Sequence, residues 1–278
     1  MKGVLVVLLG ALTAGTAAFR VDRLREGSAP GYHLLYLPSG RSLKALTFGY
    51  EGLVADLIYI WSIQYYSNYQ IQDRYEYLDQ IYRRVIAELD PHFIDPYLVG
   101  SMIMSVEANR DDLALKLLDA GTRNNPREWI LPFQAGFLCY NKLHDYACAR
   151  DNFQRAQAIP GAPAPARRLF AEMYNRLGDK RTSLKYWAEI HDTADSGYVR
   201  QVSWMHVHDL RLEVDLDDLN ALVQRYRESH GSFPGSLRDL VRAGLLDAVP
   251  VDPDGNPYTL SPETGIVRSQ ARRLLQGR

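Results

Sequence analysis

The sequence lacks most features that mark enzymes and nucleic-acid-binding proteins. It contains no Gly-x-Ser-x-Gly elbow, no glycine-rich phosphate loop and no His-Glu-x-x-His pair. We therefore expect no enzyme, no cofactor and no small-molecule substrate. Lys and Arg together number 32 and Asp and Glu 33, for a formal charge of -1 at pH 7, so charge gives no reason to expect a nucleic-acid partner.

Cysteine is also scarce, since Cys139 and Cys148 are the only two. Their positions could meet across one helix hairpin. We expect two small buried thiols, and a disulfide is the alternative if the compartment is oxidising. The sequence leaves open whether they are bonded.

The first long uncharged run extends from Gly3 to Phe19, after Lys2 and before three arginines at positions 20, 23 and 25. It is short for a helix that crosses about 30 Å of hydrocarbon and long for a signal-peptide core. We expect residues 1–26 to form a signal anchor, and a cleaved signal peptide is the alternative. Basic residues flank both ends, so charge does not fix the orientation.

Residues 124–192 repeat with a period of about 34, which is the length of a helix pair. A helix pair cannot bury its apolar face alone, so successive pairs must stack. The small residue on the second helix moves from Ala149 to Ser183. The copies contain Phe133, Gly136, Tyr140, Asp145, Tyr146, Ala149, Phe153 and Ala156, then Phe170, Ala171, Tyr174, Gly178, Asp179, Ser183, Trp187 and Ile190, after a looser copy with Leu98, Met102, Ala114, Leu118, Gly121 and Pro126.

The spacing of aromatic and small residues, with the Gly-Asp turn at residues 176–180, resembles the tetratricopeptide repeat. His144 replaces the turn glycine, Arg167 takes a usual aromatic position, and Gly161 stands where proline is common. The resemblance implies that residues 50–195 form a solenoid of stacked helical hairpins.

The first hairpin of this array is expected between Tyr50 and Leu89, after a linker or cap at residues 27–49. Its first helix, 50–66, has one face formed by Leu53, Leu57, Ile60, Trp61 and Gln64, which we expect to pack within the array. Glu51, Asp56 and Gln64 argue against a second membrane span, and Asp56 is expected on the polar edge. The second helix, 73–89, should stop at Asp90-Pro91.

Tyrosines crowd this hairpin. We interpret them as aromatic filling between stacked helices, and the alternative is an aromatic belt near a bilayer or a partner surface. The run 37–66, with its Leu-Pro-Ser-Gly turn, Val54-Ala55-Asp56-Leu57 and Trp61, also resembles the opening of bacterial envelope proteins that carry tetratricopeptide repeats behind one membrane segment. That resemblance implies a helper or scaffold protein of the inner membrane whose soluble part faces the periplasm.

The last segment, 196–278, is expected to be a linking helix and a small α+β module with a β-hairpin. We expect one helix over 198–212 and a second from about Asp215 to a stop at Gly231. Ser236 and Asp239 have the spacing of a capping box, and 259–268 should form the hairpin. The apolar stripe of the second helix contains Leu216, Leu219, Leu222, Val223 and Tyr226.

Residues 226–258, from Tyr-Arg-Glu-Ser-His-Gly-Ser-Phe-Pro to Asp-Pro-Asp-Gly-Asn-Pro-Tyr, resemble the globular part of type II secretion pseudopilins and type IV pilin-like proteins. The long apolar N-terminal helix of a pilin is not attached to this segment. The resemblance implies a module that mimics or docks with a filament subunit, or one that caps the array.

Two clusters could hold metal. Asp252, Asp254 and Asn256 alternate like the start of a calcium loop, but the glycine and the twelfth-position glutamate do not fit, so we expect an Asx-and-proline turn. His206 and His208, next to Asp209, would diverge on a helix, and we expect no zinc site. The sequence leaves calcium binding by the turn open.

The fold class expected is mainly α: an N-terminal membrane helix, a tetratricopeptide-like solenoid and a small α+β module. Such an array binds partners in a groove lined by the first helix of each pair. We expect a membrane-tethered scaffold for a protein partner in an envelope machine; the alternative is a permanent structural subunit of a filament or membrane complex. The predicted groove contains Gln134, Leu138, Asn141, Lys142, Arg168, Glu172, Asn175 and Arg176.

Overall fold

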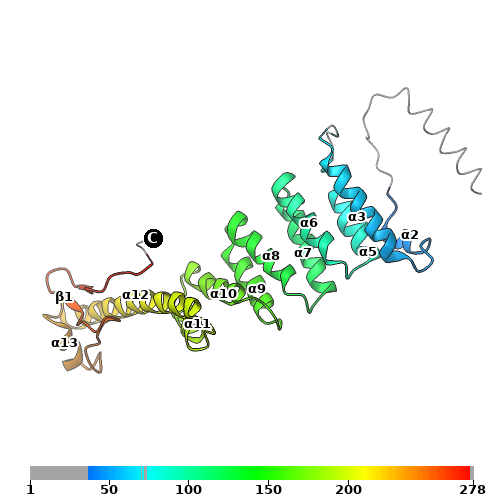
Figure 1. Ribbon diagram of the computed structural model, residues 1–278. Coiled ribbons are helices and arrows are strands. Elements are labelled where there is room, and N and C mark those ends of the chain that lie inside the picture. The colour runs from blue at the N-terminus through cyan, green and yellow to red at the C-terminus, as the bar shows by residue number, and fades with distance from the viewer. Residues whose placement is uncertain (1–36, 70, 72–73, 276–278) are drawn as a thin grey trace, which may run out of the picture. The chain divides into compact units, whose positions relative to one another are not determined.

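The computed structural model describes residues 37–69, 71 and 74–275, and within them the chain is mainly helical (Figure 1). It forms two compact units, one ending at Leu117 and the other beginning at Leu118. The predicted membrane segment 1–26 lies outside the described residues. Among the helices that the structure describes, none is both long and apolar enough to cross a bilayer.

The first unit consists of short helices connected in sequence. The predicted helix at 50–66 is confirmed as α3, and the predicted stop before Pro91 is confirmed because Asp90 is extended. The second helix of this hairpin begins at Leu78, after a turn at residues 74–77. The elements are α2 (Gly40–Lys44), α3 (Glu51–Ser67), α4 (Leu78–Ile81), the π-helical turn η1 (Tyr82–Ile86), α5 (Ala87–Leu89), α6 (Ile94–Met102), the π-helical turn η2 (Ile103–Glu107) and α7 (Asp111–Asn124), which continues into the second unit.

Tyr82 lies at the centre of this unit and is fully buried. Ser62 of α3 donates a hydrogen bond of 3.1 Å to the Tyr82 hydroxyl, and burial raises the pKa of that phenol. A Cβ atom at Gly100 would lie 2.7 Å from the Tyr82 ring. Glycine at this position therefore allows α6 to approach η1 closely.

The expectation that the Leu53 face of α3 packs within the array is wrong. Leu53, Leu57 and Ile60 are all more than half exposed, whereas Ala55, Ser62 and Tyr65 are buried. A step of two residues, as from Leu53 to Ala55, is a rotation of about 200° around the helix axis. The buried face of α3 is therefore opposite to the predicted one. The helix carries apolar residues on both sides, and periodicity alone could not choose between them.

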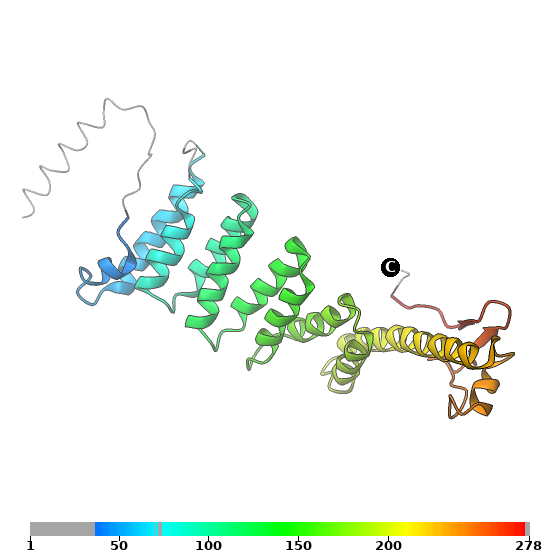
Figure 2. The ribbon, with the colours of Figure 1, turned by 180° about the vertical axis from the view of Figure 1, so that it is seen from behind.

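The second unit continues the helix pairs and ends in a small mixed module (Figures 1 and 2). Helix α9 packs against both α8 and α10, and α11 packs against α10 and α12. The elements are α8 (Ile130–Leu138), the π-helical turn η3 (Cys139–Leu143), α9 (Tyr146–Gln157), α10 (Ala164–Arg176), α11 (Lys180–Asp192), α12 (Gly197–His230), α13 (Leu237–Arg242), β1 (Thr259–Ser261) and β2 (Ile266–Arg268).

The predicted repeat is visible in the turn that joins the helices of each pair. Asn109, His144 and Gly178 occupy corresponding turn positions and all have positive φ, at 53°, 53° and 85°. Asparagine and glycine adopt this conformation at low cost, and His144 replaces the usual glycine as expected. Asp145 and Asp179 follow the last two turns, and each accepts a hydrogen bond from a first-turn backbone N–H of the next helix.

The expectation of two free thiols is wrong in this structure, because Cys139 and Cys148 form a disulfide with Cα atoms 5.8 Å apart. Cys139 begins η3 and Cys148 lies in the first turn of α9. The turn places the two residues on facing helices at the distance that a disulfide requires. The bond therefore closes the α8–α9 hairpin at its turn.

The expected break between residues 212 and 215 does not exist. Helix α12 is continuous over 34 residues, from the N-cap Ser196 to Gly231, which ends it with φ 76°. After Gly197 at its start, this run contains no glycine or proline. Leu212, Val214 and Leu219 are buried across the expected break, so packing favours one helix there.

The C-terminal module packs on the last part of α12. The expected capping box of Ser236 and Asp239 at α13 is confirmed, and β1 and β2 pair antiparallel with Leu260 opposite Val267. The apolar stripe predicted for 216–226 faces this core. The core contains Leu212, Leu219, Val223, Leu237, Leu240, Tyr258 and Val267, with Leu216, Leu222 and Tyr226 partly buried against it.

Candidate protein-interaction surface

Close packing of α8 on α9 positions the first part of the predicted groove. Phe153 and Ala149 of α9 are fully buried, and a Cβ atom at Gly136 would lie 2.8 Å from the Phe153 ring. Glycine on α8 therefore lets the two helices approach. With this face fixed against α9, the remaining positions of α8 and η3 turn outward.

The eight predicted groove residues are divided between α8 with η3 and α10. All of them keep some exposed surface, as residues that contact a partner must. Gln134, Asn141, Lys142 and Arg176 are exposed, and Leu138, Arg168, Glu172 and Asn175 are half-buried.

Arg176 brings the two sets of groove residues near each other. It donates from Nε to Glu172 at 2.9 Å, one turn earlier on α10. Burial lowers the pKa of Arg176, but the charge of Glu172 and its hydrogen bond outweigh it, and the phenols of Tyr140 and Tyr146 add to the rise, so the pKa is raised. Arg176 thus lies near the preceding helix pair, and its hydrogen bond is to Glu172.

Arg168 and Glu172 also contain buried polar atoms without a partner among the described residues. These atoms are Arg168 Nε and Glu172 Oε2. Trp187 Nε1 on α11 is also buried without a hydrogen-bond partner among the described residues. A buried polar group without a hydrogen bond costs about 1–3 kcal/mol. An incoming polar group could recover part of this free energy.

A pocket that the sequence did not reveal lies beside Arg168. Its volume is about 370 Å³, and it lies between the start of α10 and the turn that joins α11 to α12. Arg167 lines it and donates to Thr193 Oγ1 at 3.0 Å, while the Arg168 guanidinium lies 5.9 Å from the Tyr198 ring centre. No local sequence pattern marks this pocket, because its lining comes from segments between Gln157 and Val199 that meet only when the helices pack.

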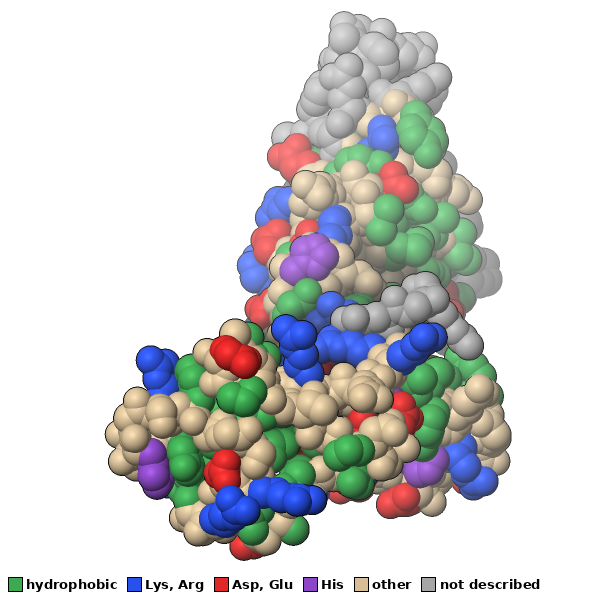
Figure 3. All heavy atoms as spheres, turned by 90° about the vertical axis from the view of Figure 1, so that its left-hand side faces the viewer, with side chains coloured by type: hydrophobic (Ala, Val, Ile, Leu, Met, Phe, Trp, Pro, Cys, Tyr) green, Lys and Arg blue, Asp and Glu red, His purple; other side chains and the backbone are tan. Residues whose placement is uncertain are grey.

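Charges of both signs are interspersed with hydrophobic side chains on the face drawn in Figure 3. Several ion pairs join neighbouring helices, such as Lys180 with Asp217 at 2.9 Å. Some Lys and Arg side chains gather near the middle of this view, and Asp and Glu side chains lie around them (Figure 3).

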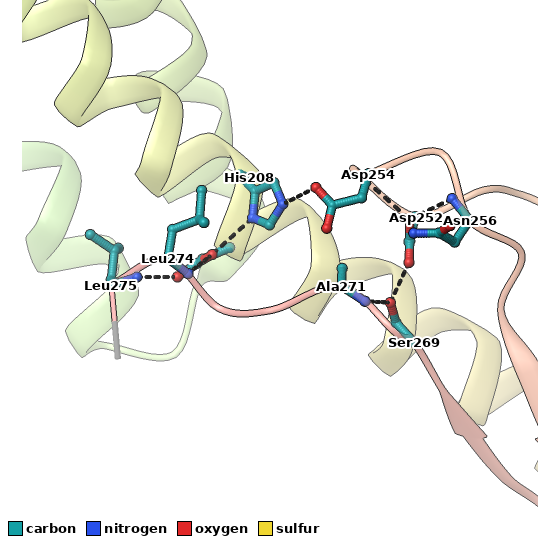
Figure 4. A network of polar contacts seen from close by, with 9 residues as sticks. His208, Asp252, Asp254, Asn256, Ser269, Ala271, Leu274 and Leu275 are labelled. Carbon is teal, nitrogen blue, oxygen red and sulfur yellow. Dashed lines mark hydrogen bonds and ion pairs between the residues drawn. The ribbon is translucent and has the colours of Figure 1, made fainter. Parts of the chain in front are cut away.

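His206 and His208 point in different directions, as their spacing on a helix predicts. His206 stacks on Trp187, whereas His208 is buried, with Nδ1 2.9 Å from Asp209 and Nε2 3.1 Å from Asp254 (Figure 4). The His208 contacts join α12 to the 252–256 turn.

Asp252 uses its carboxylate within the turn itself. It accepts from the backbone N–H groups of Asp254 and Asn256 at 3.1 and 2.8 Å, and from Ser269 Oγ at 2.5 Å (Figure 4). This is the expected Asx turn. Across the described part of the chain, no three His, Cys, Asp or Glu side chains are grouped to hold a metal ion.

No family model matches this chain, and no curated protein matches it. Among solved structures, it is similar to a thermophilic TPR protein of Thermus thermophilus, with 18% sequence identity and a TM-score of 0.35. The match covers 60% of this chain and 95% of that one. The helix pairs of this chain are established by their own contacts, described above.

Proposed function

We propose that this protein is a membrane-tethered repeat scaffold, facing the periplasm, that binds another protein during assembly of an envelope machine such as a type IV pilus or type II secretion apparatus. The observation that carries the proposal is the packing of α9 in one helix pair against α10 of the next, with the Arg150 guanidinium 5.9 Å from the Tyr174 ring centre. Residues of two successive pairs thus supply one polar surface. Stacked pairs bind extended peptides or helices on such a surface.

The partner is a protein, held by polar contacts along α8, η3 and α10. Lys142, Arg168 and Arg176 outnumber Glu172 among the charged groove residues, which favours a partner segment with acidic side chains. The tether rests on the uncharged run before Arg20. The link to a secretion or pilus machine rests on the resemblance of residues 226–258 to pseudopilins.

Charge reversal tests the groove. Lys142→Glu with Arg176→Glu should abolish partner capture after crosslinking in the native membrane and mass spectrometry, while circular dichroism stays unchanged. Arg155→Glu with Arg181→Glu is the matched control, because both residues are exposed and lie outside the predicted groove. Equal capture by the groove variant and the wild type would reject the assignment.

A second candidate is a permanent structural subunit of a filament or membrane complex. It is favoured by the apolar side chains of α3 that are exposed to solvent, including Leu53, Leu57 and Ile60. A full chain that purifies only inside a large assembly would support this interpretation. A monomeric, well-behaved full chain in detergent would support the scaffold.

A further inference from the structure

Helix α3 carries apolar residues on two opposite sides. Ala55, Ser62 and Tyr65 face the protein core, and Leu53, Leu57 and Ile60 face outward with 55–59% of their surface exposed. The outward residues are spaced by four and three, so they form one stripe. An apolar stripe on a helix is ordinarily covered by other apolar groups, and within the described residues only the Ala55 side of this helix is covered.

The α2–α3 connection extends the stripe. Leu46 and Tyr50 are each 67% exposed, and Phe48 is 88% exposed with a φ of 51°. A bulky residue with positive φ is uncommon and strained, and here no burial of the ring offsets the strain. We name the set the outer stripe; its members are Leu46, Phe48, Tyr50, Leu53, Leu57 and Ile60.

Basic side chains lie at one end of the outer stripe, and acidic side chains lie along it. Arg41 and Lys44 lie on α2, just before the stripe. Glu51 accepts a hydrogen bond from Thr47 at 2.9 Å and interacts with Lys44, so its charge is partly compensated. Asp56 is exposed and lies at the edge of the stripe, about 60° around the helix from Leu53.

The uncharged run before Arg20, the proposed membrane tether, is the reason to expect a bilayer within reach of α3. The uncharged run ends at Phe19, and the described chain begins at Leu37. Eighteen residues span at most about 60 Å even when fully extended. Aliphatic side chains with aromatic residues at one end and basic residues nearby are typical of elements that lie in the membrane interface.

We infer that the outer stripe lies in the headgroup region of an anionic lipid bilayer, with α3 parallel to the membrane surface. The inference rests on the membrane tether proposed above. Leu53, Leu57 and Ile60 enter the boundary between headgroups and acyl chains, while Arg41 and Lys44 meet lipid phosphates. The contact fixes which way the first helix pair faces.

The test is a depth measurement on the full chain in vesicles of phosphatidylethanolamine and phosphatidylglycerol. Leu57→Cys is labelled with the fluorophore NBD without reductant, so that the Cys139–Cys148 disulfide stays unlabelled. Val106→Cys is the matched control, because Val106 is 68% exposed in the same unit but lies on η2. Both side chains point to solvent, so neither substitution removes a core contact.

The expected result is an emission shift to the blue at position 57, with loss of most emission when the lipids carry nitroxide headgroups, and neither effect at position 106. A blue shift that lipid nitroxide does not quench would mean that protein covers the stripe, either a second copy or the chain's own N-terminal segment, and would overturn the inference. So would emission typical of water at position 57.

Failure of the tether gives a different result. A chain that does not sediment with the vesicles would overturn both the tether and the lipid contact. A chain that sediments but shows no quenching at position 57 overturns the lipid contact alone. Partner capture by Lys142 and Arg176 is measured separately and does not depend on either outcome.

Discussion

The indole of Trp187 on α11 lies parallel to the imidazole of His206 on α12, with ring centres 3.8 Å apart and 2° between the planes. This stack is part of the core where α10, α11 and α12 meet. The neighbouring cluster contains Ala171, Ile190 and Leu210. The His206 ring is half-buried against this cluster, and its burial makes it costly to charge.

The first prediction concerns pH. Burial lowers the pKa of His206 from 6.5 to about 4, against a smaller opposite effect of Asp209. The unfolded chain therefore binds a proton between pH 6.5 and 4 that the folded chain does not, and stability falls as the pH drops through this window. The expected loss is about 2 kcal/mol after allowance for the partial exposure of the ring.

Urea unfolding followed by tryptophan fluorescence at pH 7, 5.5 and 4.5 measures this loss. His206→Phe should remove most of the pH dependence, whereas His230→Gln, at an exposed position on the same helix, should keep it. The assignment to His206 fails if the two variants lose stability equally on acidification.

The second prediction concerns the close contact of α8 and α9. Gly136→Ala should lower the free energy of unfolding by about 1–2 kcal/mol, because overpacking against Phe153 exceeds the gain in helix propensity. Gly197→Ala is the control. A Cβ atom there meets nothing within 4 Å, so we expect no loss. Thermal unfolding of both variants gives the comparison, and a neutral Gly136→Ala would contradict the packing described.

The third prediction concerns the disulfide between Cys139 and Cys148. The bond closes a loop with a sequence separation of 9, for which the chain-entropy model gives a stabilisation of about 2.5 kcal/mol. Reductant should lower the urea midpoint of the wild type and leave a Cys139→Ala, Cys148→Ala double variant unchanged. Thiol titration of the denatured, unreduced protein should find no free thiols, and two titratable thiols would refute the bond.

The fourth prediction concerns the C-terminal tail. Asp209 accepts backbone N–H bonds from Leu274 and Leu275, both at 2.9 Å (Figure 4). Burial raises the pKa of Asp209, but these two bonds and His208 outweigh it, so the pKa is lowered. The carboxylate therefore stabilises the fold at neutral pH and loses this contribution only as the pH falls through its lowered pKa.

Asp209→Asn should cost about 1–3 kcal/mol, because the amide nitrogen cannot accept from a backbone N–H. Hydrogen exchange at Leu274 and Leu275 should become faster. Asp217 is the control, because it lies on α12 like Asp209 but is exposed and pairs with Lys180 of α11. Asp217→Asn should change the free energy of unfolding by less than about 1 kcal/mol. Unchanged exchange in Asp209→Asn would show that the tail is held by other contacts.

Local signals in the sequence were sufficient for the helix pairs and their turns. The repeat spacing predicted that His144 and Gly178 occupy the turn between paired helices, where the structure has positive φ. The spacing of Ser236 and Asp239 predicted the capping box. The orientation of α3 could not be predicted, because apolar residues on both sides give no preferred face. The continuity of α12 depended on burial of Leu212 and Val214 by distant segments, which local patterns do not contain.

The candidate groove was predicted only as a set of positions. Helix spacing indicated which residues of α8 and α10 face outward, and all eight keep some exposed surface. The sequence could not predict that Arg176 lies near Tyr140 and Tyr146, because that contact depends on how one pair sits on the next. The disulfide could not be predicted, because two cysteines nine residues apart occur both as free thiols and as a disulfide.

Helix α12 has a mechanical consequence. Helix α11 contacts it as far as Asp217 and Asp218, and the C-terminal segment contacts it from His208 onward, so the two contacts overlap along one unbroken helix of about 50 Å. A bent or hinged connection would let the two ends swivel separately. Because one continuous helix carries both contacts, a tilt of α12 on α11 moves the module with it.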